Sequence, residues 1–374
     1  MGQVGEGEEV RRGTWEVGSR KSEFRSQKSE SVGSACAAGF PSPLRGGVRG
    51  GGERDDENMS KTHHLRSTPQ TVHWGFLDGS LMPVLTVDSG DRVRIDCITC
   101  TPESSPAPAS GMKLLPEMVE VFAKAPRGAG AHIMTGPVAV RGAEIGDVLE
   151  VRILEVTPRI DWGFNLFRPY SGTLPEDFDH PGLVHIPLDL QRGIATVAGG
   201  IEIPARPFFG QLAVQPPLKA GRQSSKEPRG YGGNLDCKEL TAGATIYLPC
   251  FVPGGGFSTG DGHWSQGDGE VDGTAIETCL SGVFEFHVRK DLDWVMPRAE
   301  TATHFIAFGL DPDLDDAAKQ ALREMIGWIT SMTNLSRDDA YRLCSYICDL
   351  HVTQTVNNVK GIHAMLPKSV LQRS

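Results

Sequence analysis

A single histidine and several carboxylates lie close together within the glycine-rich stretch 232–279. Asn234 and Asp236 precede an apolar run, and Asp261 and His263 follow it. Further acids crowd the chain after the histidine: Asp268, Glu270, Asp272 and, just beyond them, Glu277. One imidazole beside several carboxylates suits Zn²⁺ or a similar divalent ion with an open coordination position. Such an ion could polarise an acyl oxygen or activate a water molecule.

Glycines in the same stretch favour tight turns or a close approach of the backbone to another group. They would let Asp261 and His263 point inward together. Three other interpretations of this loop stay open: a solvated acidic turn, a calcium site and a cupin-like metal site. The calcium site lacks the EF-hand order of ligands and the flanking helices, and the cupin-like site lacks a second histidine close by.

The balance of charge argues against several classes of partner. The chain of 374 residues has 37 basic and 47 acidic side chains, a formal net charge of −10, and its Lys and Arg residues form no stripe. Nucleic acid and anionic membranes are therefore not expected as main partners. No apolar run reaches the length of a membrane span, and the N-terminus lacks the apolar segment of a signal peptide. The sequence predicts a cytoplasmic protein.

The eight cysteines are spread too widely along the chain to indicate a disulfide framework. Cys97 and Cys100 form a C-x-x-C pair on a strand-like run, and no second pair follows. Neither a thioredoxin turn nor a zinc ribbon is therefore expected there. Cys344 and Cys348 lie one helical turn apart and are expected to pack in the core.

Residues 1–58 are rich in Gly, Ser, Arg and Glu without sustained periodicity, which predicts a disordered N-terminal extension. The folded domain is expected over 59–374, with a β core over about 63–306. Alternating apolar residues follow glycine turns in that core, a pattern typical of antiparallel strands packed as a sandwich. Long loops are expected over 163–182 and 216–234, and one short helix near 111–123.

The C-terminal part, about 307–374, changes to a helical period. A helix is expected over 311–333, with acidic residues at its start, where the helix dipole favours them. Ser336 and Asp339 have capping-box spacing and predict a second helix. The helical hairpin and a last strand at 351–357 are expected to serve as scaffold or oligomer contact rather than chemistry. The buried face of the first helix is expected to comprise Leu314, Ala318, Leu322, Met325 and Ile329.

The glycine-rich stretch 232–277 closely resembles the central motif of the acetamidase/formamidase family. Segment 132–156, with a histidine before T-G-P and a later G-D turn, resembles the family's other hallmark, and 83–91 and 360–369 are also similar. The resemblance covers about 63–368. It implies a jelly-roll-like β-sandwich, here with a C-terminal helical hairpin, and hydrolysis of short linear amides to carboxylate and ammonia. It also implies a bound divalent metal, commonly zinc, and a homo-oligomer.

The resemblance also implies roles for individual residues. Its metal ligands would be Asp236, Asp261, His263 and Glu277. Its general base and acid would be Asp268 and Glu270, while His132 would orient the substrate or its leaving amine and Asn234 would donate to the carbonyl oxygen. Two positions depart from the family pattern, because Tyr231 replaces a second histidine and Ile133 replaces a proline. These departures concern the choice of substrate more than the type of reaction.

Three other functions remain as alternatives. A lactam hydrolase would use the same site with a different pocket, and a non-catalytic jelly-roll binding protein would need no such cluster of acids. A cysteine amidase would use the thiol of Cys237. Adjacent residues of a strand point to opposite faces, so Cys237 should turn away if Asp236 faces the site. A metal-activated water is therefore the expected nucleophile.

Overall fold

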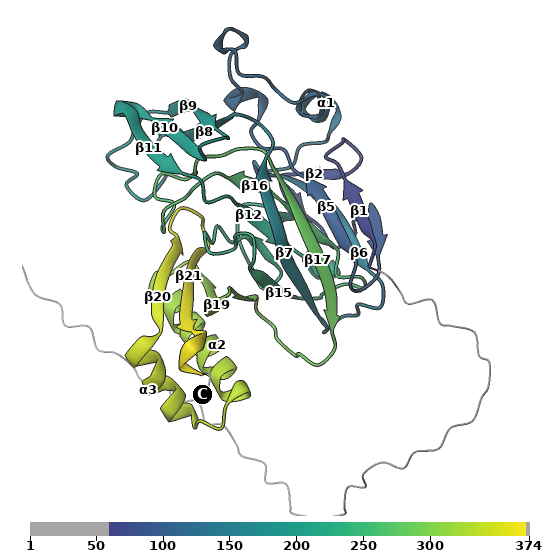
Figure 1. Ribbon diagram of the computed structural model, residues 1–374, viewed down its shortest axis with the longest axis vertical. Coiled ribbons are helices and arrows are strands. Elements are labelled where there is room, and N and C mark those ends of the chain that lie inside the picture. Colours follow the sequence, from purple (N-terminus) through teal and green to yellow (C-terminus); the bar gives the residue numbers. More distant parts are fainter. Residues whose placement is uncertain (1–59, 372–374) are drawn as a thin grey trace, which may run out of the picture. The chain divides into compact units, whose positions relative to one another are not determined.

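Residues 60–371 are described by the structure, a computed structural model, and its largest sheet has nine strands (Figure 1). The strand order is β1-β5-β17-β7-β15-β18-β19-β21-β20, and all neighbours are antiparallel except β1 and β5. In that order the strands span Thr62–Leu65, Arg92–Asp96, Leu280–Arg289, Val148–Pro158, Thr245–Pro249, Arg298–Glu300, His304–Asp311, Lys360–Pro367 and Asp349–Gln354. The predicted extension 1–58 lies outside the described residues.

A second sheet has the order β14-β12-β16-β6-β2, and β4 pairs with β6. These strands span Gly232–Asn234, Phe208–Ala213, Phe257–His263, Ile133–Val140, Val72–Trp74 and, for β4, Leu85–Val87. Aromatic side chains join the two sheets across the core. The ring of Phe284 on β17 lies 5.6 Å from that of Phe209 on β12 and 5.3 Å from that of Phe257 on β16. The strands thus pack face to face around a common apolar core, as the alternating pattern predicts.

The mainly β class is confirmed, while the jelly-roll topology stays a prediction. Two smaller sheets are β11-β10-β9-β8 and β13-β3. Their strands span Ile201–Pro204, Ile194–Val197, Gly182–Asp189, Trp162–Phe167, Gln223–Ser224 and Phe76–Leu77. The prediction of long loops over 163–182 and 216–234 is therefore wrong in part. β8 runs through the start of the first segment, and β13 and β14 lie in the second.

The predicted helices are confirmed as α1 (Pro116–Lys124), α2 (Leu314–Met332) and α3 (Arg337–Ile347). Ser336 caps α3, because its hydroxyl accepts a bond from Asp339 N at 3.1 Å and donates to Asp339 Oδ2 at 2.6 Å. The predicted last strand corresponds to β20, but a further strand, β21, follows it. Short 3₁₀ helices span Pro102–Ser104, Pro108–Ser110, Ala198–Gly200, Leu218–Ala220 and Lys368–Val370.

The face that α2 buries differs in part from the predicted one. Met325 and Ile329 are fully buried as expected, and so are Ala317 and Ala321, which were not predicted. The predicted Leu314, Ala318 and Leu322 are only partly buried against the same cluster. Gly309 on β19 explains the change, since a Cβ there would meet the backbone of Ala317 and Ala321. The helix lies so close to the strand that only small side chains fit between them.

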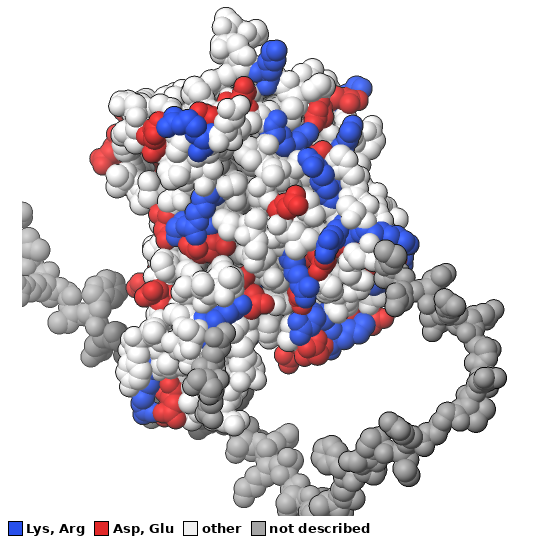
Figure 2. All heavy atoms as spheres, in the orientation of Figure 1, with Lys and Arg blue, Asp and Glu red and all other residues white. Residues whose placement is uncertain are grey.

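Acidic and basic side chains are interspersed on the face of the molecule in Figure 2. Many of them pair at short distance, for example Arg289 Nη1 with Glu150 Oε2 at 2.8 Å. Such a mixed surface agrees with the absence of a basic stripe in the sequence. Among the helices of residues 60–371, none is long and apolar enough to cross a membrane.

Candidate active site

Three neighbouring strands of the second sheet bring the predicted ligands together. β16 is buried along its whole length and ends with Asp261 and His263. It pairs with β12, where Phe208 lies opposite His263, and β12 pairs with β14, where Gln211 lies opposite Asn234. Because β14 ends at Asn234, the chain places Asp236 next to the end of β16. The sheet itself therefore positions the cluster.

The backbone is strained at three of the acidic residues. Among the described residues, five non-glycine residues have a positive φ, and three of these are Asp236 (51°), Asp261 (58°) and Glu270 (45°). The left-handed region costs a non-glycine residue about 1 kcal/mol or more. Such strain persists only where the surrounding structure over-determines it, and it concentrates at functional sites. The strain therefore marks this cluster independently of its charge.

The imidazole of His263 lies at the centre of four buried carboxylates. Its Nε2 atom is 3.3 Å from Glu277 Oε1 and 3.6 Å from Asp261 Oδ2. Asp236 and Asp261 together with His263, and Glu270 and Glu277 together with His263, each place potential ligand atoms within 4.8 Å of one another. All five side chains are buried, His263 completely so. Buried charges at this density require a counter-ion or protons.

The residues present fit a divalent ion, as two observations show. First, Asp236 Oδ1 and both ring nitrogens of His263 are buried without a hydrogen-bond partner among the described residues. Second, the absence of a side chain at Gly210 leaves space beside these atoms, because a Cβ there would lie 2.6 Å from both Asp236 Oδ1 and Asp261 Oδ2. Unpartnered carboxylate and imidazole atoms that converge beside a glycine form the donor set that Zn²⁺ prefers.

Gly210→Ala is expected to weaken binding of a divalent ion by about 10–100-fold, the usual cost of displacing groups around a metal. The new methyl group would force Asp236 Oδ1 and Asp261 Oδ2 apart. Gly267→Ala is the matched control, since a Cβ there meets no atom within 4 Å. Titration of the ion-free variants with Zn²⁺ measures both affinities. Equal affinities in the two variants would contradict this placement of the ion.

Burial and mutual repulsion shift the pKa values of the cluster. Burial and the charge of Asp261 raise the pKa of Asp236 well above its usual value. Burial and the charge of Asp236 do the same for Glu270. Burial also raises the pKa of Glu277, although His263 opposes it. Burial acts in the same direction on Asp261, but the charges of His132 and His263 outweigh it and lower the pKa of Asp261 to about 2.

The ion-free protein is expected to lose stability as pH rises above the ordinary carboxyl pKa of about 4 and through the raised pKa values of the folded state. Asp236, Glu270 and Glu277 have raised pKa values in the folded state, so folding holds protons that the unfolded chain releases above its ordinary carboxyl pKa of about 4. Asp261 acts oppositely, but only below that range. Because a divalent ion replaces these protons, the rise in melting temperature on adding Zn²⁺ should grow with pH. If the rise in melting temperature became smaller at higher pH, the ion and the protons would not compete for the same carboxylates.

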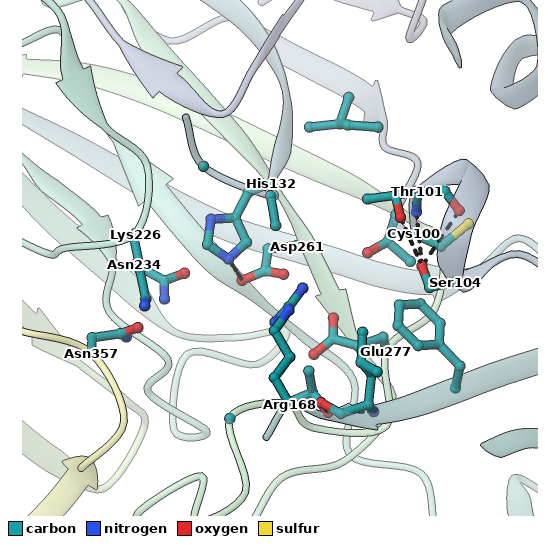
Figure 3. A pocket seen from close by; sticks show the side chains of 18 of the residues that line it. Cys100, Thr101, Ser104, His132, Arg168, Lys226, Asn234, Asp261, Glu277 and Asn357 are labelled. Atoms are coloured by element: carbon teal, nitrogen blue, oxygen red, sulfur yellow. Dashed lines mark hydrogen bonds and ion pairs between the residues drawn. The ribbon is translucent and has the colours of Figure 1, made fainter. Parts of the chain in front are cut away.

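The cluster opens into a cavity of about 360 Å³ (Figure 3). Asp261, Glu270 and Glu277 line one side, while Asp236 and His263 lie behind them. The other lining polar side chains include His132, Asn234, Asn357, Thr99, Arg168 and Lys226. Carboxylates with raised pKa values that face a cavity are characteristic of catalytic sites.

Gln211 orients two of the predicted catalytic side chains. Its Nε2 atom donates to Asn234 Oδ1 at 2.5 Å and lies 3.1 Å from His132 Nδ1. Gln211 Nε2 also donates to Ser225 O at 2.6 Å, and His132 Nε2 lies 3.8 Å from Asp261 Oδ2 (Figure 3). The amide oxygen of Asn234 is occupied, and its amide nitrogen has no hydrogen bond among the described residues. Asn234 can therefore donate into the cavity.

Asp268 is the one predicted site residue that lies outside this cavity. Its Oδ2 atom is 2.7 Å from Lys238 Nζ and 3.1 Å from His351 Nδ1. His351 belongs to the C-terminal strand β20. The other seven residues that the resemblance implies lie in or directly behind the cavity. Glu270, two residues later, faces the cluster and holds a raised pKa, so it alone of the pair has the position of an acid-base group.

Gly210, Gln211 and Asn357 belong to the site but were not predicted from the sequence. Gly210 interrupts an aromatic strand, and a glycine inside a strand signals close approach of another group. No comparable signal marks Asn357, whose Nδ2 donates to Asp236 Oδ2 at 3.3 Å. It follows β20, so the C-terminal part contributes to the cavity, while its expected role as scaffold or oligomer contact stays a prediction. That part supplies a wall of the cavity.

Comparison with known proteins shows that the chain is similar in sequence to amidases. The sequence profile of the acetamidase/formamidase family matches residues 61–226 and 219–373. The formamidase of Methylophilus methylotrophus is 36% identical over 191 residues, 37% of this chain and 47% of that protein. The acetamidase of Mycolicibacterium smegmatis is 30% identical over 219 residues, 43% of this chain and 53% of that protein. The chain thus spans about half the length of the curated relatives it matches.

A solved structure extends the similarity over nearly the whole domain. The crystal structure of an acetamidase from Bacillus halodurans superposes with a TM-score of 0.72 at 28% sequence identity. The alignment covers 82% of this chain and 98% of that chain. The fold around the cavity is therefore shared with that acetamidase as a whole.

Proposed function

Because the chain belongs to the acetamidase/formamidase family, we propose that it cleaves the C–N bond of short linear amides, such as formamide and acetamide, to a carboxylate and ammonia. The main support for this proposal is a group of buried donor atoms next to the cavity. The unpartnered oxygen of Asp236 and both nitrogens of His263 converge beside Gly210, directly behind a cavity lined by Glu270. A binding module would need neither the buried donors nor the strained backbone that holds them.

Asp236, Asp261, His263 and Glu277 would hold a divalent ion. Zn²⁺ is preferred over Ca²⁺, since Ca²⁺ takes oxygen ligands whereas an imidazole lies at the centre of this set. When bound, such an ion supplies a Lewis acid and lowers the pKa of a water to about 7.

The protein's own groups bind the amide and move its protons. Asn234 Nδ2 donates to the amide oxygen, because its own oxygen is held by Gln211. Glu270 takes the proton of the attacking water and passes it to the leaving nitrogen, a task that suits a buried carboxylate with a raised pKa. His132 orients the amide group through Nε2, the ring nitrogen on the side of Asp261. These side chains surround one space, so the amide can contact all three at once.

Cys237→Ser is expected to keep most of the turnover, although the buried hydroxyl should lower stability by about 1–3 kcal/mol. Cys237 is fully buried in the core, does not line the cavity, and burial raises the pKa of its thiol to about 12. A thiol that stays protonated is a poor nucleophile. Ammonia release by the folded, metal-loaded variant measures the effect. Complete loss of turnover in that variant would instead indicate covalent catalysis.

Ammonia release from formamide, acetamide, propionamide and a set of lactams tests the substrate class directly. We expect turnover of the linear amides. Turnover of lactams alone would assign the site to cyclic amides, and no turnover of either class by the metal-loaded protein would favour a binding role.

A cytoplasmic location and a homo-oligomeric state, dimer or higher, complete the proposal. Exposed aromatic side chains on α3, Tyr341 and Tyr346, are 58% and 77% exposed and support a contact surface there. Sedimentation at micromolar concentration distinguishes an oligomer from a monomer.

A further inference from the structure

A second group of potential ligands lies outside the cavity, where Asp268 meets strands β20 and β21. Asp268, His351 and His363 each offer one atom, and these three atoms lie within 4.8 Å of one another. His351 Nδ1 is 3.1 Å from Asp268 Oδ2. The two histidines are directly opposite each other in the antiparallel ladder, and their rings stack with centroids 5.1 Å apart. The sheet therefore brings both histidines to the same face, and the partly exposed ring of His351 would have to turn out of this stack for both imidazoles to direct a nitrogen at one ion.

His363 provides an independent indication of a missing partner. Its side chain is completely buried, and its Nδ1 atom is 2.8 Å from Thr353 Oγ1. Its Nε2 atom is buried without a hydrogen bond to any described residue. A buried, unpartnered ring nitrogen costs about 1–3 kcal/mol, which a ligand at that atom would recover. One nitrogen anchored by a neighbour and the other free is the usual arrangement of a metal-binding histidine.

The types of donor indicate which ion would bind. Two imidazoles and one carboxylate suit Zn²⁺, Co²⁺ or Ni²⁺, whereas Ca²⁺ and Mg²⁺ take oxygen ligands. The cluster around His263 is different, with one imidazole and four carboxylates. The two groups should therefore differ in their preference among divalent ions.

Lys238 opposes an ion at this position and so sets its affinity. Its Nζ atom lies 2.7 Å from Asp268 Oδ2 and 2.9 Å from Glu239 Oε1. A divalent ion could use the other oxygen of Asp268, or Lys238 could remain with Glu239 alone. In either case the ammonium group repels the ion, so its removal should tighten binding.

We propose that Asp268, His351 and His363 form a second site for a divalent transition metal, separate from the cluster at His263 and independent of the function proposed above. Asp268 also belongs to the same loop as Glu270, so an ion bound to Asp268 would affect that loop. Gly269 N donates to Thr353 O at 3.2 Å, and Thr355 N donates to Gly269 O at 3.0 Å. These bonds already link Gly269 to the end of β20 and to Thr355 just beyond it, and an ion on Asp268 and His351 would add a further link between the loop and β20.

The experiment compares the number of Zn²⁺ ions bound per chain by the wild type, His351→Ala and His287→Ala, each stripped of metal and titrated with Zn²⁺ alone. His351 is only partly buried, so its replacement should leave the fold intact. His287 is the matched control, a strand histidine 2.9 Å from the carboxylate of Glu285 without a third ligand. We expect His351→Ala to bind one ion fewer than the wild type and His287→Ala to bind the same number. This difference does not depend on whether the cluster at His263 binds an ion.

The Lys238→Met variant should change the affinity for the second ion in the opposite direction to His351→Ala. It should tighten the second ion by on the order of tenfold, because it removes a positive charge close to the ion. A structural role of Lys238 in an ion-pair network predicts no such gain. Equal ion numbers in the wild type and His351→Ala, or a Lys238→Met variant with unchanged or weaker affinity, would overturn the proposal.

Discussion

His263→Ala is expected to lose both the bound ion and amide hydrolysis, with turnover reduced roughly a thousandfold or more. Loss of an ion that acts as Lewis acid removes several kcal/mol of transition-state stabilisation, and each 1.4 kcal/mol is a factor of ten in rate. Removal of the imidazole takes away the only nitrogen ligand, and Asp236, Asp261 and Glu277 remain as three buried carboxylates in mutual repulsion. Metal analysis and ammonia release on the same preparation measure both losses.

The core between the two sheets should stay folded in this variant. His263 ends β16, so the change removes its edge-on contact with Phe208 and its contacts with Asp261 and Glu277 at the end of the sheet. The aromatic contacts of Phe284 between the two sheets remain. A cooperative melting transition is the control. A variant with full metal content and normal turnover would place the active site elsewhere.

Glu270→Gln should keep the ion but lower turnover by about 10²–10⁴, the typical contribution of general acid-base catalysis. The amide has nearly the same shape as the carboxylate but cannot accept the proton. Burial and the charge of Asp236 raise the pKa of Glu270, and a raised pKa is typical of carboxyl groups that transfer protons in catalysis. The drop should therefore appear mainly in kcat and not in KM, since the lost step follows substrate binding.

Glu155→Gln is the matched control for the same chemical change, because Glu155 lies exposed on β7 and is not among the residues that line the cavity. It should leave metal content and turnover unchanged. If Glu270→Gln instead loses the ion together with its activity, Glu270 is a ligand and another group moves the proton.

Local patterns predict the elements well because their causes are local. Ser336 and Asp339 start α3 through bonds that span three residues, and alternation along β5 places Val93 and Ile95 in the core. The buried face of α2 is harder to predict. It depends on Gly309, which lies on a different element and lets the helix approach closely.

In the candidate site, too, residues within a local motif could be predicted, whereas those that depend on distant contacts could not. The glycine-rich motif identifies Asp261, His263 and Glu277, but proximity in sequence is a poor guide for Asp268 and Glu270. The positive φ values of Gly269 (96°) and Glu270 (45°) turn the chain so that the two carboxylates face different clusters. Asn357 reaches Asp236 across 121 positions, and no local pattern carries such a contact.

The requirement for a metal ion is tested most directly by the rate of ammonia release from acetamide as ion-free protein is titrated with Zn²⁺. We expect negligible turnover without the ion and a rate that rises in proportion to occupancy of the cluster at His263. His351→Ala should reach its full rate at one ion per chain, because we expect only that cluster to bind an ion in this variant. Full turnover by the ion-free protein, with no change on addition of Zn²⁺, would show that amide hydrolysis needs no ion at His263.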